Sequence, residues 1–123
     1  MPQGAARFSL PQRQRLRRRG EFGAALRAKR VAASAHFAAW AKRNGLRYAR
    51  LGVVAAKRIA KRAVDRNRAR RLVREAFRRA QAALAGLDVV VQLRRPLDRR
   101  ASADCREELA CIVAEIDRWR ASL

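Results

Sequence analysis

The sequence predicts a small α/β (α+β) two-layer sandwich, in which three helices pack on a small mixed sheet. Segments with the two-residue period of strands alternate along the chain with segments that have the 3.6-residue period of helices. The 123 residues leave room for one core. We therefore expect a flexible basic arm at residues 1–8 and a single α/β domain over residues 9–121.

The first predicted elements are a short helix and a strand. The helix begins near Gly20, after an Arg-rich segment, and carries Phe22 on its apolar side. A strand is expected over residues 33–42. In an extended chain, Phe37 and Trp40 point to opposite faces of such a strand.

A hairpin is predicted next, because the dipeptide Asn44-Gly45 is a strong hairpin signal. The strand that pairs with residues 33–42 is then expected over residues 46–57. One further short strand within residues 46–60 stays open as an alternative.

Residues 63–85 form the main predicted helix, and its two sides differ in chemistry. With about 100° between successive residues, the apolar sector contains Ala69, Leu72, Val73, Ala76, Phe77, Ala80 and Leu84. The opposite side contains Asn67, Arg70, Arg71, Arg74 and Arg78. The helix is thus amphipathic with a basic outer face, and Gly86 is expected to cap its C-terminus.

The last third of the chain predicts a buried strand and a closing helix. Residues 87–93 are an apolar run with β-branched residues at its centre, which suits a buried strand. Ser102 is expected to cap the final helix, with Asp104 in its first turn. The apolar side of this helix consists of Cys105, Leu109, Ile112, Val113, Ile116 and Trp119.

The positive charge is concentrated in the first 87 residues. The chain has 31 Lys and Arg against 10 Asp and Glu, a formal net charge of +21, whereas residues 88–123 contain seven of each kind. Residues 57–79 contain 11 basic and two acidic side chains. Like charges on one helix repel by roughly 0.2–0.5 kcal/mol per pair, so folding alone does not explain this run.

Arg binds phosphate bidentately and stacks on bases, so the Arg-rich run points to a nucleic acid, with a solvated helix face as the alternative. Folded RNA is favoured over duplex DNA, because the sequence has no zinc finger, zipper or dimerising heptads. Trp40 shares its predicted strand face with Ala38 and His36, a smooth surface that suits a single strand. Core packing is the alternative for the aromatic residues near the basic segments, which are Phe22, Phe37, Trp40 and Tyr48.

Several classes of protein are excluded. No apolar stretch is long enough to span a membrane, and the N-terminus has no apolar signal segment, so we expect a cytoplasmic protein without a membrane partner. Two cysteines provide neither a disulfide framework nor a four-ligand zinc set. We expect Cys105 to lie in the core and Cys111 to be an exposed thiol.

The sequence predicts no catalytic residue and no metal ligand in the protein. His36 is the only histidine and lacks a flanking nucleophile motif. The acidic residues of the basic half are Glu21, Asp65 and Glu75, too few for a two-metal nuclease site. A contact from Asp65 to a hydrated magnesium ion at an RNA interface is the alternative.

Residues 63–77, AVDRNRARRLVREAF, resemble the RNR motif, which is the signature of the protein subunit of bacterial ribonuclease P. Residues 50–58 are similar to the family's preceding strand. Weaker matches that keep the family's order extend the resemblance over residues 9–120, at Arg15-Leu16, Glu21-Phe22, Phe37 to Trp40, Asp88 to Val91 and Arg95-Pro96.

The resemblance implies a small subunit of a ribonucleoprotein whose RNA performs the chemistry with Mg²⁺ held mainly by that RNA. The protein binds the catalytic RNA and the 5′ leader of precursor tRNA, and promotes endonucleolytic removal of the leader. A left-handed βαβ crossover is also implied, which spacing alone does not suggest. The oligomeric state of the free protein stays open.

The family's binding residues carry over by position. Those facing the catalytic RNA are Lys57, Arg58, Lys61, Arg66, Asn67, Arg68, Arg70, Arg71 and Arg74. Those of the leader-binding cleft are Arg18, Phe22, Leu26, Ala38 and Trp40. Three positions depart from the family: Leu26 where an aromatic is often found, Trp40 in place of Tyr, and Ala60 in place of Gly.

A basic structural protein that packs into ribosomal RNA, with no enzymatic role, is the alternative function. An ordered RNR helix together with a leader cleft distinguishes the two, because a purely structural protein needs no cleft.

Overall fold

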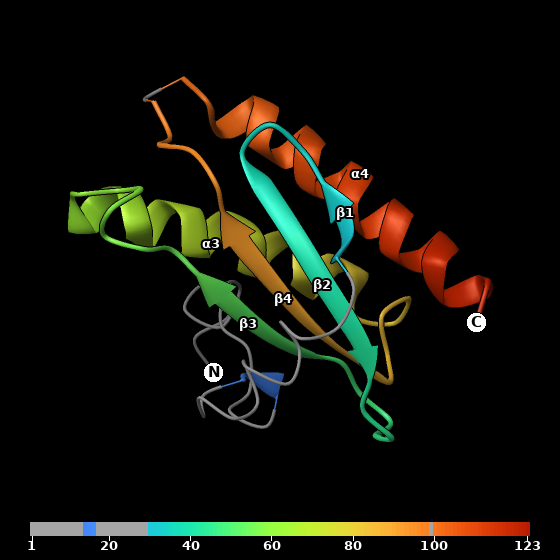
Figure 1. Cartoon of the computed structure of the whole chain (residues 1–123). Helices are drawn as coiled ribbons and strands as arrows, with labels where there is room; N and C mark the ends of the chain where they lie inside the picture. The colour runs from blue at the N-terminus through green and yellow to red at the C-terminus, as the bar shows by residue number, and fades with distance from the viewer. Residues whose placement is uncertain (1–13, 17–29, 99) are drawn as a thin grey trace, which may run out of the picture.

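The structure, a computed structural model, describes residues 14–16, 30–98 and 100–123. These residues form a four-stranded mixed sheet with two helices on one of its faces (Figure 1). The predicted two-layer α/β fold is confirmed to this extent, whereas the predicted arm at residues 1–8 and the predicted helix near Gly20 lie outside the described residues. The elements are β1 (Arg30–Ala33), β2 (Phe37–Arg43), β3 (Arg50–Val54), α3 (Ala63–Ala80), β4 (Leu87–Leu93) and α4 (Ser102–Ala121).

The strand order is β1-β2-β4-β3, so the predicted hairpin between residues 33–42 and 46–57 is wrong. β4 lies between β2 and β3, antiparallel to the first and parallel to the second. The turn after β2 does form, since Gly45 has a φ of 72° and the Leu46 amide donates to Asn44 Oδ1 at 2.7 Å. The strands beyond it nevertheless separate, because β4 is buried on both faces and pairs along both edges.

The predicted strand over residues 33–42 is in fact two strands. A tight turn at residues 34–36 separates β1 from β2, and the Ser34 amide donates to the Phe37 carbonyl at 2.7 Å. His36 therefore lies in this turn, and the prediction that it shares a strand face with Ala38 and Trp40 is wrong.

The main core lies between the sheet and the helices. Phe37 is fully buried there and Trp40 points to the other face of the sheet, as predicted. The predicted apolar sides of both helices are confirmed, since the buried residues of α3 are Ala69, Leu72, Val73 and Phe77 and those of α4 are Cys105, Leu109, Ile112 and Ile116.

Both predicted helix caps are wrong. α3 ends at Ala80 and not at residue 85, because residues 81–86 turn back toward β4 with Leu84 buried in the core. Gly86, with a φ of 85°, therefore precedes β4 and does not cap the helix. α4 begins one residue earlier than predicted, so that Ser102 is its first residue and Asp104 still lies in its first turn.

Within the described residues, neither helix is long and apolar enough to cross a membrane.

Candidate nucleic-acid interface

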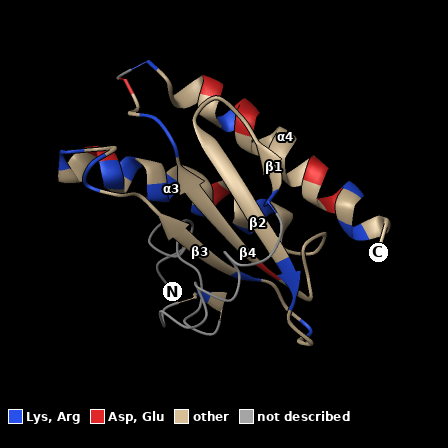
Figure 2. Cartoon of the chain, in the orientation of Figure 1, with Lys and Arg blue, Asp and Glu red and all other residues tan. Residues whose placement is uncertain are grey.

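The outer side of α3 presents a basic hollow to solvent. Helical spacing brings residues three and four apart onto one face, and the buried side of α3 fixes which face points outward. Basic residues follow α3 in Figure 2. The hollow measures about 240 Å³ and is lined by Asn67, Arg70, Arg71 and Arg74. No acidic residue lines it.

The two acidic residues of α3 pair with other arginines. Asp65 Oδ2 lies 3.6 Å from Arg62, and Glu75 Oε1 lies 2.9 Å from Arg79. Neither carboxylate is thus paired with the arginines of the hollow. Asp65, for which a contact with a hydrated magnesium ion was the alternative, thus has a partner within the protein in Arg62.

Arg15 lies close to the basic hollow, although sequence reasoning did not include it in the site. Burial lowers the pKa of the Arg74 guanidinium, and the nearby charges of Arg15 and Arg70 lower it further. Spacing could not relate Arg15 to α3, and only the match of Arg15-Leu16 to the family's order pointed to this segment. Arg15 and Arg70 thus both repel Arg74 here, and a polyanion would relieve this repulsion.

Hydrogen bonds fix the segment that carries Arg15. The Leu16 amide donates to the Leu51 carbonyl at 2.8 Å, which places this segment along the edge of β3. Gln14 Nε2 donates to Gln81 Oε1 at 3.1 Å, just beyond the end of α3. The segment therefore connects the edge of the sheet to the helix that carries the hollow.

Two of the predicted RNA-binding arginines hold the protein's own backbone. Arg66 NH1 donates to the carbonyl oxygens of Ala60 and Lys61, both at 2.9 Å. Arg68 donates to the carbonyl oxygen of Asp98. Arg66 therefore organises the loop before α3, and Arg68 fastens the loop before α4 to α3. Arg70, Arg71 and Arg74 remain as the arginines that line the hollow.

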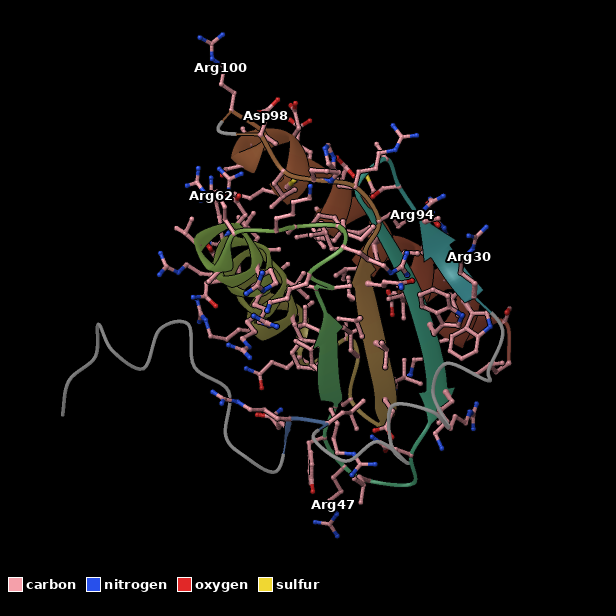
Figure 3. The ribbon with its side chains drawn as sticks, turned by 60° about the vertical axis from the view of Figure 1, so that its left-hand side comes forward. Arg30, Arg47, Arg62, Arg94, Asp98 and Arg100 are labelled. Carbon is pink, nitrogen blue, oxygen red and sulfur yellow. The ribbon has the colours of Figure 1, made fainter. Side chains whose placement is uncertain are left out.

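The loop between β3 and α3 adds the three exposed side chains of Lys57, Arg58 and Lys61, which the family resemblance assigns to the surface that faces the catalytic RNA. Ala60 is 3% exposed, so this position packs inward while its neighbours point to solvent. Figure 3 shows Arg62, Asp98 and Arg100 toward one end of the molecule, with Arg47 at the other.

The face of the sheet away from the helices carries the described part of the predicted leader cleft. Trp40 is half-buried and pairs in register with Arg30, whereas Ala38 is only 1% exposed. Leu16 and Val90 form a small second cluster on this face. The other predicted leader contacts, Arg18, Phe22 and Leu26, lie outside the described residues. Trp40 and the basic hollow thus belong to different layers of the fold.

The two cysteines lie as predicted, with Cys105 buried and Cys111 exposed. Burial raises the pKa of the Cys105 thiol to about 11, so this thiol is protonated at neutral pH.

The chain matches a known protein family and several of its members. A protein-family model described as Ribonuclease P matches residues 10–117. The chain is 46% identical over 90 residues to the ribonuclease P protein component of Nitrosomonas europaea, and the aligned region covers 73% of this chain and 76% of that protein. It is 39% identical over 108 residues to the ribonuclease P protein component of Chromobacterium violaceum, and the aligned region covers 88% of this chain and 89% of that protein.

Two solved structures have a similar fold. The RNase P protein of Staphylococcus aureus superposes with a TM-score of 0.74 at 22% identity, over 82% of this chain and 93% of that one. The RNase P protein of Thermotoga maritima superposes with a TM-score of 0.59 at 28% identity, over 83% and 90%.

Proposed function

Because the chain belongs to the ribonuclease P protein family, we propose that it is the protein subunit of a ribonuclease P ribonucleoprotein. It binds the catalytic RNA subunit and the 5′ leader of precursor tRNA, and it promotes the endonucleolytic cut that gives the mature 5′ end. The RNA subunit performs the chemistry with Mg²⁺ that it holds mainly itself. The protein contributes binding and no catalytic side chain, and it acts in the cytoplasm.

The observation that carries this proposal is the basic hollow on α3. Arg70, Arg71 and Arg74 line it, no acidic residue is part of its lining, and the charge of Arg15 lies close by. A guanidinium donates two parallel hydrogen bonds to a phosphate, and neutralising phosphates releases condensed counterions from the RNA. The hollow therefore supports a contact with the backbone of a folded RNA.

The remaining residues divide between two RNA partners. Lys57, Arg58, Lys61 and Asn67 extend the surface for the catalytic RNA, while Arg66 and Arg68 hold the loops beside it in place. On the other face of the sheet, Trp40 and Ala38 belong to the leader site, which Arg18, Phe22 and Leu26 complete. Because the two surfaces lie on different layers, both RNA partners can be bound at once.

Two finer features of the fold belong to the same proposal. β3, α3 and β4 form a crossover between neighbouring parallel strands, and we expect it to be left-handed, as the family resemblance implies. The third helix is expected near Gly20, which lies outside the described residues.

Processing of precursor tRNA tests the proposal. The purified chain is added to a bacterial ribonuclease P RNA at a low magnesium concentration that limits the RNA alone, and the released 5′ leader is measured. Faster 5′ cleavage than with RNA alone is the expected result. An unchanged rate would refute the proposal and favour a structural role in ribosomal RNA.

A further inference from the structure

Three side chains with different donor atoms converge where the β1–β2 turn meets the start of α4. His36 in the turn, and Cys105 and Glu108 on α4, each offer one ligand atom, and these atoms all lie within 4.8 Å of one another. Cys105 and Glu108 are three residues apart, which places them on one face of the helix. Spacing along the chain could not identify this group, because His36 and the two α4 residues are distant in sequence.

The carboxylate of Glu108 is held in place. Glu108 Oε1 accepts hydrogen bonds from Ser34 Oγ at 2.5 Å and from the His36 amide at 2.8 Å. Glu108 Oε2 lies 2.6 Å from His36 Nδ1. Hydrogen bonds of this kind orient the ligands of metal sites, so the turn prepares the carboxylate for a cation.

Acidic residues accompany this group, unlike the hollow on α3, whose lining has none. Asp98, Asp104 and Glu107 lie close by in the chain, in the neutral last third, and Figure 2 shows acidic residues on α4. Two cations also approach: Arg68 acts on Cys105, and Arg94 NH1 donates to the Ser34 carbonyl at 3.0 Å. Both arginines donate to backbone carbonyls, Arg94 to that of Ser34 and Arg68 to that of Asp98.

We propose that His36, Cys105 and Glu108 form a binding site for a divalent metal ion of the zinc class. Zn²⁺ accepts thiolate, imidazole and carboxylate ligands, and three protein ligands leave a fourth position for water. Ligands about 2.0–2.3 Å from a tetrahedral ion lie about 3.3–3.8 Å from one another. The three donors reach that arrangement once the ion enters between His36 and Glu108 and widens their contact.

The donor set separates this ion from the magnesium that serves the RNA. Mg²⁺ prefers an octahedron of oxygen ligands, and a thiolate is a poor ligand for it. The side chains of His36 and Glu108 are 22% and 16% exposed, so an ion from solvent can reach these two ligands, whereas Cys105 is fully buried. Binding forms a metal–sulfur bond and releases the thiol proton to the solvent. The ion would fasten the β1–β2 turn to α4.

The test is a zinc titration of the full chain, followed by calorimetry, with Co²⁺ absorption as a second readout. The site variants are Cys105→Ser and His36→Gln. The matched control is Cys111→Ser, which removes the exposed thiol of the same helix and leaves the three ligands intact. Circular dichroism of the metal-free variants checks that each is folded.

We expect one Zn²⁺ per chain, unchanged binding in Cys111→Ser, and at least tenfold weaker binding in both site variants. Co²⁺ should give a thiolate charge-transfer band that disappears in Cys105→Ser. Absence of stoichiometric binding, or equal binding by all three variants, would overturn the proposal. If Cys105→Ser does not fold, His36→Gln decides alone, because His36 lies in a partly exposed turn and not in the core.

Discussion

Replacing Arg70, Arg71 and Arg74 together by Ala should weaken binding to the RNA subunit and flatten its dependence on salt. These three arginines line the hollow on α3, whereas Arg66 and Arg68 hold the protein's own carbonyl groups. The triple variant therefore removes the charge that lines the hollow, while the bonds that shape the two loops persist.

The size of the effect follows from counterion release. Each neutralised phosphate adds about 0.7–0.9 to the slope of the logarithm of affinity against the logarithm of salt concentration. Loss of three contacts should reduce this slope by about 2–3. Between 50 and 200 mM salt, the wild type should then lose about 20- to 40-fold more affinity than the triple variant.

Filter binding or fluorescence anisotropy over a salt series measures the slope. The matched control replaces Arg100, Arg106 and Arg118 by Ala, which removes the same charge from α4 and the loop before it. The control should keep a slope near that of the wild type. Equal slopes for the wild type and the α3 variant would refute the argument, because the α3 face would then be merely solvated.

Three further variants test separate parts of the structure. Trp40→Ala should weaken the binding of precursor tRNA more than that of mature tRNA, by about 1–3 kcal/mol if its ring stacks on a base, and equal losses in equilibrium binding would show that Trp40 does not contact the leader. Phe77→Ala should lower the free energy of unfolding in urea by about 3–5 kcal/mol, because this side chain is 3% exposed in the core; a loss below 1 kcal/mol would contradict that packing. Burial alone would raise the pKa of Glu108, but hydrogen bonds from Ser34 and His36 lower it overall. Glu108 therefore stabilises the fold above its unfolded pKa, and this contribution is lost as the pH falls through its folded pKa. The stability difference between the metal-free wild type and Glu108→Gln should shrink below about pH 4.5, and a difference that is constant with pH would count against the network.

The helical elements were predictable because their periodicity is local. The apolar side of α3 and that of α4 follow from residue spacing, and the structure buries the residues that the pattern selects. Strand pairing was not predictable in the same way. Asn44-Gly45 forms its turn, but the pairing depends on β4, which follows a whole helix later and separates β2 from β3. Tertiary burial of β4 thus overrides a local hairpin signal.

The candidate site was predictable only in part for a similar reason. The basic face of α3 is a property of one helix, so spacing locates Arg70, Arg71 and Arg74. The proximity of Arg15 and the contact of Arg68 with residue 98 depend on how distant segments pack. Spacing also assigns Arg66 to the RNA-facing motif without showing that it bonds the loop before its own helix.

The most direct test of the function is the ratio of affinities of the assembled ribonucleoprotein for precursor tRNA and for mature tRNA. The measurement compares the RNA subunit alone with the RNA subunit saturated by this chain, at one salt and magnesium concentration. If the protein holds the catalytic RNA through α3 and the leader on the other face of the sheet, the chain should raise the ratio in favour of precursor tRNA. An identical ratio with and without the chain would contradict leader recognition by this protein.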